Sequence, residues 1–390
     1  MYDFKTSIDR TGTGAIKIDF APEPVKGSGL VPLTIADQEF AVAPEIIEGV
    51  KKAADRGVFG YTYADAEYKA AVLGWMKRRH NWDADGFRLF PTNGVVPALA
   101  LAVLAFTEPG DGVVIQSPVY MQFAHAVRSN DRRIVENCLI EHDGHYEMDF
   151  DDLDEKTRPD DVKLMLLCSP HNPVGRVWTK EELARLGEIC VRNNVVIVAD
   201  EIHNDLIMNG AEHTVFANIP GMADHAVICT AASKTFNLAG LGCSSIFIKN
   251  EELAEKFHAV CDRLGGGLVP YFARAATIAA YNECAQWVDE LCDAVYSNFK
   301  MLKAFVEANL PMLRVIPLEG TYLAWLDMRA LGLDNKQLAE HMLKYGLAFD
   351  EGDLFGDSGK GFERWNLALP QEKLVIALFA LKKAVQELTR

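Results

Sequence analysis

Several polar side chains that could take part in chemistry stand directly after short apolar runs in the middle of the chain. They are Tyr120, Asn172, Asp200, His203, Ser233 and Lys234. A lysine in this position is costly to bury unless its amine is neutral or is used covalently. Taken alone, Asn172 could be a turn former and Asp200 could cap the next element. Lys234 therefore points most directly to chemistry, as a neutral or covalently bonded amine.

Four apolar runs predict the strands that must carry these side chains. They lie at residues 111–118, 162–170, 195–201 and 226–233. Runs this apolar are typical of strands buried on both faces, and their alternation with helical stretches predicts a parallel sheet covered by helices. Thr179 and Glu182 can form a capping box at the start of one such helix. Because open α/β sheets bind ligands beyond the carboxyl ends of their strands, we expect the polar side chains to share one crevice.

The length of 390 residues, with 49% apolar side chains, predicts two domains in an α/β chain. Helical patterns follow Glu251 and cover residues 285–308, residues 320–328 are typical of a strand, and the last twenty residues form a helical pattern. We expect an N-terminal segment at 1–45 that packs with the small domain. The large domain is expected at 46–284 and a smaller α+β domain at 285–390.

The composition argues against several kinds of partner. With 39 basic and 55 acidic residues the net charge is -16, so neither a nucleic acid nor an anionic membrane is expected as a partner. No apolar run reaches the ~18 residues of a membrane span, and the start of the chain lacks the pattern of a signal peptide. The eight cysteines show no CxxC pair or metal-ligand spacing. These features predict a cytoplasmic protein without a metal site.

Three motifs in a fixed order resemble a known family. SPHNPVG, then ADEIH, then SKTFN are similar to the motifs of the fold type I pyridoxal phosphate enzymes, the aminotransferase class I/II superfamily. The resemblance runs from ADQEF at 36–40 to RWN at 364–366. It implies a large domain whose mostly parallel seven-stranded sheet is sandwiched by helices, a smaller α+β domain, and pyridoxal 5'-phosphate as the cofactor.

The resemblance also implies roles around the cofactor ring. Lys234 would be the catalytic residue that holds the cofactor as a Schiff base. Asp200 would pair with the pyridine nitrogen and keep it protonated, so that the ring can accept negative charge. Asn172 and His203 would hydrogen-bond the phenolic oxygen. Tyr120 would stack on the ring face.

The cofactor phosphate would be held mainly by backbone amides. Gly94, Val95 and Val96 begin an apolar helical stretch, and amides at a helix start bind phosphate without a basic side chain. Ser233 can add a hydroxyl. Tyr61 matches a tyrosine that, in the family, reaches the phosphate of the neighbouring subunit. A homodimer with shared active sites is therefore implied.

On the substrate side, Arg364 matches the family arginine that grips an α-carboxylate, a task that suits the guanidinium fork. Tyr322 and the backbone near Ala36 and Asp37 are expected to line the same side. The expected substrate-binding residues are thus Ala36, Asp37, Tyr120, Asn172, Tyr322 and Arg364.

Particular residues point to one branch of the family. Aminotransferases of this fold commonly carry tyrosine in place of His203, serine in place of Ala231 and arginine in place of Gly242. The combination FGYTY, SPHNPVGRVW, DEIHNDL and SKTFNLAGL instead resembles the cystathionine β-lyase branch, the MalY/PatB-type carbon–sulfur lyases. ADQEF departs from the ADMDF usual in that branch.

The branch implies α,β-elimination of L-cystathionine or related cysteine S-conjugates to pyruvate, ammonia and a thiol, with Lys234 as the general base. Two alternatives stay open. One is an aminotransferase, which needs an oxo acid to complete its cycle. The other is a regulatory protein that binds the cofactor and has a side lyase activity. The intact set of Lys234, Asp200 and Arg364 favours catalysis.

Overall fold

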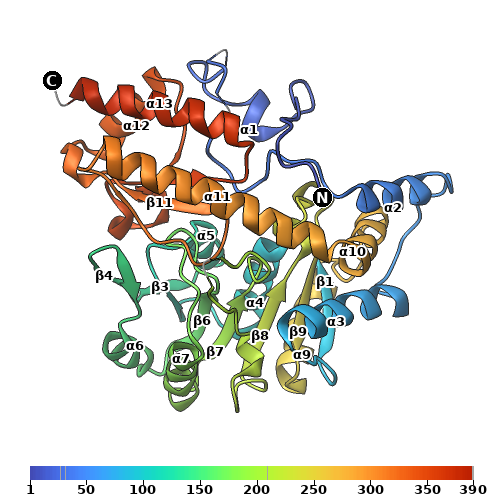
Figure 1. The fold of residues 1–390 in the computed structure, drawn as a ribbon. Coiled ribbons are helices and arrows are strands. Elements are labelled where there is room, and N and C mark those ends of the chain that lie inside the picture. The colour runs from blue at the N-terminus through green and yellow to red at the C-terminus, as the bar shows by residue number, and fades with distance from the viewer. Residues whose placement is uncertain (27, 31, 209, 389–390) are drawn as a thin grey trace.

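A seven-stranded sheet lies at the centre of the larger part of the chain in the computed structural model, which describes residues 1–26, 28–30, 32–208 and 210–388 (Figure 1). In sheet order the strands are β1 (Arg88–Thr92), β9 (Ser244–Ile248), β8 (Ala226–Thr230), β7 (Val196–Asp200), β6 (Val162–Cys168), β2 (Gly112–Ile115) and β3 (Arg133–Glu136). Neighbours from β8 to β3 are parallel, whereas β9 is antiparallel to both β8 and β1. The predicted mostly parallel sheet is confirmed, and the four predicted runs form β2, β6, β7 and β8.

Helices cover both faces of this sheet. They are α3 (Ala66–His80), α4 (Val95–Phe106), α5 (Gln122–Arg128), α6 (Phe150–Thr157), α7 (Lys180–Arg192), α9 (Glu251–Arg263) and α10 (Tyr271–Glu283), while α2 (Pro44–Ala54) packs against α10. Alternate residues of β6 point to opposite layers, because side chains alternate along a strand. Leu164 and Leu166 pack in the cluster that contains α4, α5 and α9, while Met165 and Leu167 pack in the cluster that contains α3 and α7. Two buried faces explain why these strands read as continuous apolar runs.

Helix α7 connects β6 to the parallel strand β7 and begins as predicted. The Thr179 hydroxyl accepts a hydrogen bond from the Glu182 amide at 3.1 Å, and the Glu182 carboxylate accepts one from the Thr179 amide at 2.7 Å. This reciprocal pair satisfies amides that the first helical turn leaves without partners. The capping box predicted from the sequence is confirmed.

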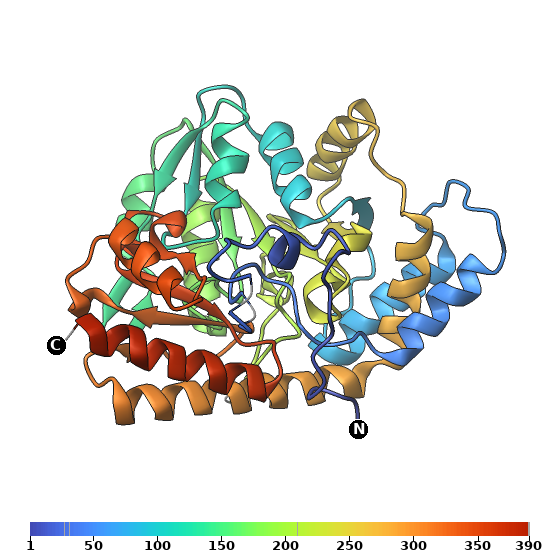
Figure 2. The ribbon, with the colours of Figure 1, turned by 90° about the horizontal axis from the view of Figure 1, so that it is seen from above.

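A second, antiparallel sheet of four strands is formed near the C-terminus. Its order is β10 (Arg314–Val315), β11 (Leu323–Asp327), β13 (Phe362–Asn366) and β12 (Asp350–Glu351). The helices of this part are α11 (Ala285–Asn309), α12 (Asn335–Lys344) and α13 (Gln371–Leu388). Seen from above, the long helix α11 runs from beside α10 along the small sheet, with α13 next to it (Figure 2). A smaller α+β part therefore accompanies the large sheet, as predicted.

The N-terminal segment, with its short helix α1 (Ile16–Asp19), lies against the small sheet (Figure 2). The Leu33 amide donates to the Ala348 carbonyl at 2.9 Å, and the Glu39 amide donates to the Ala368 carbonyl at 2.8 Å. These contacts join the segment to residues that flank β12 and β13. The domain boundaries at residues 45 and 284 stay predictions.

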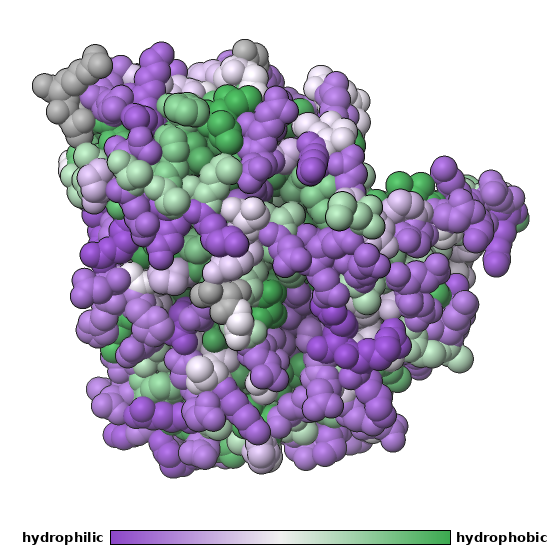
Figure 3. All heavy atoms as spheres, viewed as in Figure 1, coloured by the Kyte–Doolittle hydropathy of each residue, from purple (hydrophilic) through white to green (hydrophobic). Residues whose placement is uncertain are grey.

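The remaining elements are short. They are the hairpin of β4 (Ile140–His142) and β5 (His145–Glu147), the four-residue helix α8 (Ala232–Thr235), and the 3-10 helices at Phe216–Asn218, Ala239–Leu241, Arg329–Leu331, Gly352–Phe355 and Asp357–Gly359. On the face shown in Figure 3 hydrophilic side chains predominate, as the net charge leads one to expect. None of the helices in the described ranges has both the length and the apolar character that crossing a membrane requires.

Candidate active site

A cavity of about 220 Å³ lies at the carboxyl ends of β6, β7 and β8. Most of the predicted site residues line it, namely Ala36, Gly94, Val95, Val96, Tyr120, Asn172, Asp200, His203, Ser233 and Lys234. They come from the loops after the four predicted strands, from the start of α4 and from the N-terminal segment. The crevice expected from the strand pattern is therefore present, and it gathers residues far apart in the sequence.

Lys234 stands on α8, directly after β8. Its Nζ donates a hydrogen bond to the Ala36 carbonyl oxygen at 2.6 Å. The side chain is partly accessible from the cavity and otherwise surrounded by protein atoms. Loss of hydration and, to a smaller extent, the charge of Arg364 lower the pKa of the Lys234 amine from 10.5 to about 8, and the carboxylates of Asp37, Asp200 and Asp350 partly oppose them. Near pH 8, the Lys234 amine is therefore neutral in a substantial fraction of the molecules.

Asp200, the last residue of β7, is the acidic counterpart of this amine. It is 6% exposed, and its Oδ1 accepts a hydrogen bond from the Ile202 amide at 3.1 Å. Burial raises the pKa of the carboxyl group to about 7, although the Ile202 amide and the Lys234 charge both favour the ionised form. A positive group placed against Asp200 would reverse this shift, because it would favour the carboxylate.

His203 and Asn172 lie on the same side of the cavity. Burial lowers the pKa of the His203 imidazole well below its ordinary value, and the charges of Lys234 and Arg364 add to the effect. The imidazole is therefore neutral, and its buried Nδ1 has no hydrogen-bond partner among the described residues. The Asn172 side-chain oxygen accepts a hydrogen bond from Arg364 Nη1 at 3.0 Å. A buried nitrogen without a partner is a position at which a ligand can complete the hydrogen bonding.

Tyr120 completes this side, because its backbone holds it next to the Asn172 loop. The Tyr120 amide donates to the Asn172 carbonyl oxygen at 3.1 Å. Burial raises the pKa of the phenol, so the ring is neutral at physiological pH. The aromatic ring lines the cavity that Asp200 and Lys234 also line.

The start of α4 opens into the cavity. Gly94 precedes the helix with φ 130° and ψ 164°, a region that glycine occupies and other residues avoid. The amides of the first helical turn lack partners within the helix and carry the positive end of its dipole. Of the described residues that line the cavity, Lys234 is the one lysine or arginine. An anionic group bound here therefore relies on the helix amides and the Ser233 hydroxyl.

Tyr322 and Arg364 do not line the cavity themselves but are bonded to residues that do. The Tyr322 hydroxyl donates to the Ala36 carbonyl oxygen at 2.8 Å, the same oxygen that accepts from Lys234. Arg364 reaches the cavity through Asn172. The structure thus brings both predicted residues of the small sheet to the site.

Arg364 is held by an acidic partner that the sequence analysis did not identify. One of its terminal nitrogens pairs with Asp350, whose position in β12 is directly opposite Arg364 in β13. The guanidinium also lies over the Phe355 ring, 4.9 Å from the centroid, and its Nε has no hydrogen-bond partner among the described residues. No local motif surrounds Asp350, so the pairing could be found from the tertiary structure alone.

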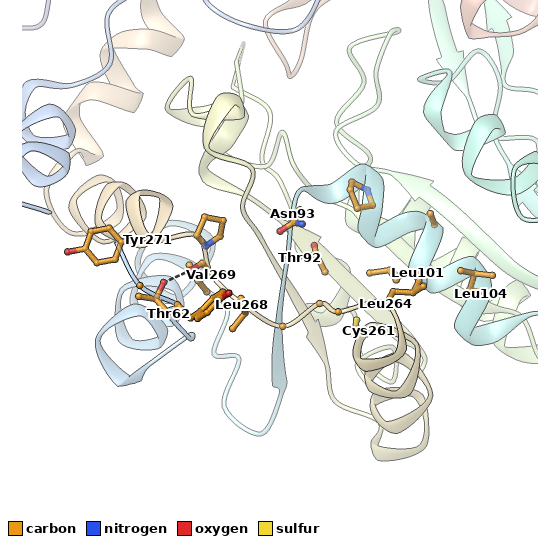
Figure 4. A pocket seen from close by; sticks show the side chains of 18 residues that line it. Thr62, Thr92, Asn93, Leu101, Leu104, Cys261, Leu264, Leu268, Val269 and Tyr271 are labelled. Atoms are coloured by element: carbon orange, nitrogen blue, oxygen red, sulfur yellow. Dashed lines mark hydrogen bonds between the residues drawn. The ribbon is translucent and has the colours of Figure 1, made fainter. Parts of the chain in front are cut away.

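Two predicted residues point away from this cavity. The Asp37 carboxylate pairs with Arg10 at 2.8 Å and with Lys17 at 3.5 Å in the N-terminal segment. Tyr61 is 92% exposed and lines a second cavity of about 520 Å³. Figure 4 shows this second cavity between the loop that carries Leu268 and the helix that carries Leu101. Within one subunit, neither of these two residues lines the cavity that Lys234 lines.

The chain matches a family and has close relatives in it. Residues 28–381 match the family described as aminotransferase class I and II. Cystathionine beta-lyase PatB of Bacillus subtilis is 41% identical over 385 residues, which cover 98% of this chain and 100% of that protein. Protein MalY of Escherichia coli is 32% identical over 389 residues, 99% of each protein.

A solved structure agrees with this relationship. The crystal structure of cystalysin from Treponema denticola, which contains a pyridoxal 5'-phosphate cofactor, matches this fold with a TM-score of 0.95 and 43% identity, and the match covers 100% of both chains. The family match, the identities and the shared architecture extend over nearly the whole chain. The protein therefore belongs to the aminotransferase class I and II family, in the fold type I architecture, as a relative of the cystathionine β-lyases.

Proposed function

We propose that this protein is a pyridoxal phosphate-dependent carbon–sulfur β-lyase. It would cleave L-cystathionine or related cysteine S-conjugates, with water, to pyruvate, ammonia and a thiol. The observation that carries the proposal is the Lys234 amine, whose pKa is lowered to about 8, in one cavity with the buried acid Asp200. A relative that is 41% identical over almost the whole chain is named a cystathionine β-lyase, which supports this reaction.

The donor set of the cavity fits pyridoxal 5'-phosphate. The partly neutral amine of Lys234 can bond covalently to an aldehyde, the unpartnered Nδ1 of His203 can meet an oxygen, and the start of α4 can receive a phosphate. When bound, the cofactor supplies an electron-accepting ring joined to the substrate amine.

Asp200 is proposed to hold the ring nitrogen of the cofactor. Its carboxyl group has a pKa raised to about 7 by burial, and a protonated nitrogen beside it would draw it into the ionised form. Asn172 and His203 would donate to or accept from the phenolic oxygen, and Tyr120 would lie against a ring face. All four residues line the same cavity.

The phosphate is proposed to lie at the start of α4. The amides of Gly94, Val95 and Val96 and the hydroxyl of Ser233 would hold it, since these residues line one end of the cavity. Gly242 also lines this end, at the place where aminotransferases commonly carry arginine. The helix amides therefore replace the cationic contact.

Lys234 is proposed to remove the α-proton of the substrate. A base works best when its pKa lies near the working pH, and the pKa of about 8 meets this condition. The Ala36 carbonyl accepts from both Lys234 and Tyr322, so it fixes the direction of the amine. Arg364 would grip the substrate α-carboxylate with its guanidinium fork, and Tyr322 with the backbone at Ala36 and Asp37 would flank it.

The protein is proposed to act as a homodimer with shared active sites. Tyr61 is 92% exposed, and its sequence neighbours Val58, Phe59 and Tyr63 are exposed as well. Exposed apolar groups in this number are typical of a surface that a partner covers. The cavity beside Tyr61 shares Asn93 and Pro97 with the cavity of Lys234, which supports a site that both subunits line.

Subunit complementation tests the shared site. Co-expression of the Lys234→Ala and Tyr61→Ala chains should give hybrid dimers that contain one complete site, so their activity should exceed that of both parents. Sedimentation should show a dimer. Activity equal to the average of the two parents would contradict the shared site.

We also propose a cytoplasmic location and the domain division at residues 45 and 284. All eight cysteines are unpaired, which is typical of a reducing compartment. Helix α10 ends at Glu283 and α11 begins at Ala285, so a boundary at 284 falls between two helices. Cell fractionation tests the location, and limited proteolysis tests the boundaries.

The reaction is tested with purified protein, L-cystathionine and no oxo acid, by measuring pyruvate and free thiol. Equal and repeated release of both products is expected. If product formation requires an added oxo acid in stoichiometric amount, the protein is an aminotransferase. Bound cofactor without either turnover would favour a regulatory role. Kinetics with cysteine and several cysteine S-conjugates then identify the preferred leaving group.

A further inference from the structure

The helix that carries Lys234 is too short to hold its own position. Helix α8 contains four residues, and the Phe236 amide donates to the Ala232 carbonyl at 2.9 Å. A single helical turn is unfavourable by itself, because the chain loses much freedom for one hydrogen bond. The place of the Lys234 amine must therefore be determined by contacts that other segments make with α8.

Asp205 contacts α8 from the side of the large sheet. Its buried carboxylate accepts hydrogen bonds from the Thr235 hydroxyl at 2.8 Å, from His80 Nε2 at 2.8 Å and from Trp75 Nε1 at 3.0 Å. Trp75 and His80 belong to α3, so one carboxylate joins α3 to the residue after Lys234. Asp205 also lies in the loop that follows Asp200, the last residue of β7, so it ties the two strand ends of the site together.

Gln38, in the N-terminal segment, also contacts α8. Its Nε2 donates to the Lys234 carbonyl at 2.8 Å and to the Thr235 carbonyl at 3.1 Å. Its own amide donates to the Asn237 side chain at 3.1 Å, and Asn237 donates back to the Gln38 carbonyl at 3.0 Å. Gln38 is therefore joined to the C-terminal half of α8 and to Asn237 just after it.

The Gln38 side chain leaves one of its own polar atoms without a partner. It is 1% exposed, and its Oε1 is buried without a hydrogen-bond partner among the described residues. A buried acceptor without a partner destabilises the folded protein. Methionine, which has a similar length and stands in the ADMDF motif of the branch, would leave no such oxygen. The gain from glutamine lies in its two bonds to the backbone of α8.

We infer that Gln38 and Asp205 are positioning residues for Lys234, which clamp helix α8 from two sides and so direct the amine at the Ala36 carbonyl. The inference rests on the proposed function of Lys234. Neither residue touches the amine itself. Gln38 fixes the backbone carbonyls of α8, and Asp205 fixes the Thr235 side chain, so a loss of either contact lets the amine move. Small displacements of a reacting group lower the rate strongly.

Thr235→Val and Gln38→Met test the clamp without opening the core. Valine keeps the shape of the fully buried Thr235 and leaves Asp205 its bonds to Trp75 and His80. With L-cystathionine, Thr235→Val should lower kcat about 10-fold and Gln38→Met about 5-fold, with KM within about 2-fold of the original. Thr235→Ser, which keeps the hydroxyl, should recover most of kcat.

Thr157→Val is the matched control, because Thr157 is equally buried and its hydroxyl donates to the Leu153 carbonyl at 2.7 Å, within α6. It should lower stability and leave kcat unchanged. The inference is overturned if Thr235→Val and Gln38→Met keep the original kcat, or if Thr157→Val lowers kcat as much as they do. Failure of the unchanged protein to release pyruvate and thiol would instead reject the proposed function.

Discussion

At the ends of β7 and β8, enclosure by the protein shifts Asp200 and Lys234 toward their neutral forms, with pKa values of about 7 and about 8. On the side of the small sheet Arg364 stays charged, because a guanidinium does not lose its proton, and Asp350 balances the charge. The strand-end side of the cavity therefore holds groups that can gain or lose a proton near neutral pH, whereas the small-sheet side, just outside the cavity, holds a compensated charge.

This difference separates chemistry from recognition. Groups that transfer protons need pKa values near the working pH. Such pKa values arise when a charged group is buried and neighbouring charges only partly balance it. A group that binds a carboxylate needs a permanent charge in a fixed direction, and buried ion pairs with further hydrogen bonds supply it. The strand-end side should therefore respond to pH and to loss of its amine, and the small-sheet side should respond to changes in geometry.

The largest effect is expected on the strand-end side, from Lys234→Ala. Without the amine, turnover should fall by about 10²–10⁴-fold or more, because the general base and the covalent attachment are both lost. The long-wavelength absorbance of the bound cofactor should disappear. Lys249→Ala is the control, since Lys249 is exposed and pairs with Asp224 at 3.4 Å. If Lys234→Ala keeps the original colour and rate, Lys234 is not the catalytic residue.

The next effect concerns the free energy of unfolding of the cofactor-free protein. The Lys234 amine has a pKa of about 8 in the folded state and 10.5 when exposed, so the unfolded state binds the proton more tightly. This lowers stability fully below pH 8, and the penalty fades as pH rises toward 10.5. Lys234→Met should therefore stabilise the protein by up to about 3 kcal/mol at pH 7.

Denaturant unfolding at pH 7 and pH 10 measures this difference. Most of the gain from Lys234→Met should be lost at pH 10, because the folded-state amine is then neutral and this pH lies close to the unfolded-state pKa of 10.5. An equal gain at both pH values would mean that packing by the methionine, and not the charge, causes the stabilisation. That result would contradict the contrast between the two sides of the cavity.

A smaller effect is expected on the recognition side. Arg364→Lys keeps the charge but loses the fork, so KM should rise about 10- to 100-fold while kcat changes less. Steady-state kinetics with L-cystathionine measure both constants. Arg314→Lys is the control, because Arg314 is on the outer strand of the same small sheet and half exposed. An unaltered KM for Arg364→Lys would show that the carboxylate binds elsewhere.

The smallest effect is expected from Gly94→Ala at the start of α4. Alanine would strain the backbone at φ 130°, although its Cβ would meet Pro97 at an ordinary 3.6 Å. The free energy of unfolding should fall by about 1–3 kcal/mol, and cofactor affinity should weaken. Gly240→Ala is the matched control, since a Cβ there meets no atom within 4 Å. If the two substitutions have equal effects, the proposal that the start of α4 binds the phosphate is wrong.

Much of the fold could be predicted from local patterns. The strands β6 and β7 appear as uninterrupted apolar runs because both faces of the sheet are covered. Thr179 and Glu182 predicted the start of α7 through their capping box. The strand-end residues Asn172, Asp200 and Lys234 could be singled out because polar groups after buried strands lie at one edge of the sheet.

Other features could not be predicted, because they depend on contacts between distant segments. Asp350 meets Arg364 across two strands of the small sheet, and nothing in its neighbourhood in the sequence marks it. Gln38 reaches Lys234 across 196 positions of the chain. The predicted roles of Tyr61 and Arg364 came from resemblance to the family and not from local pattern.

By itself, the sequence determined the central strands β2, β6, β7 and β8, the family and the amine at the centre of the proposed chemistry. These follow from periodicity, caps and motifs, which act over a few residues. Only the tertiary structure decided that Asp37 turns toward Arg10 and Lys17, that Asp350 compensates Arg364, and that Lys234 and Asp200 share an enclosed cavity. Hydration and charge act through space, so the pKa of an amine depends on neighbours that the order of residues does not reveal.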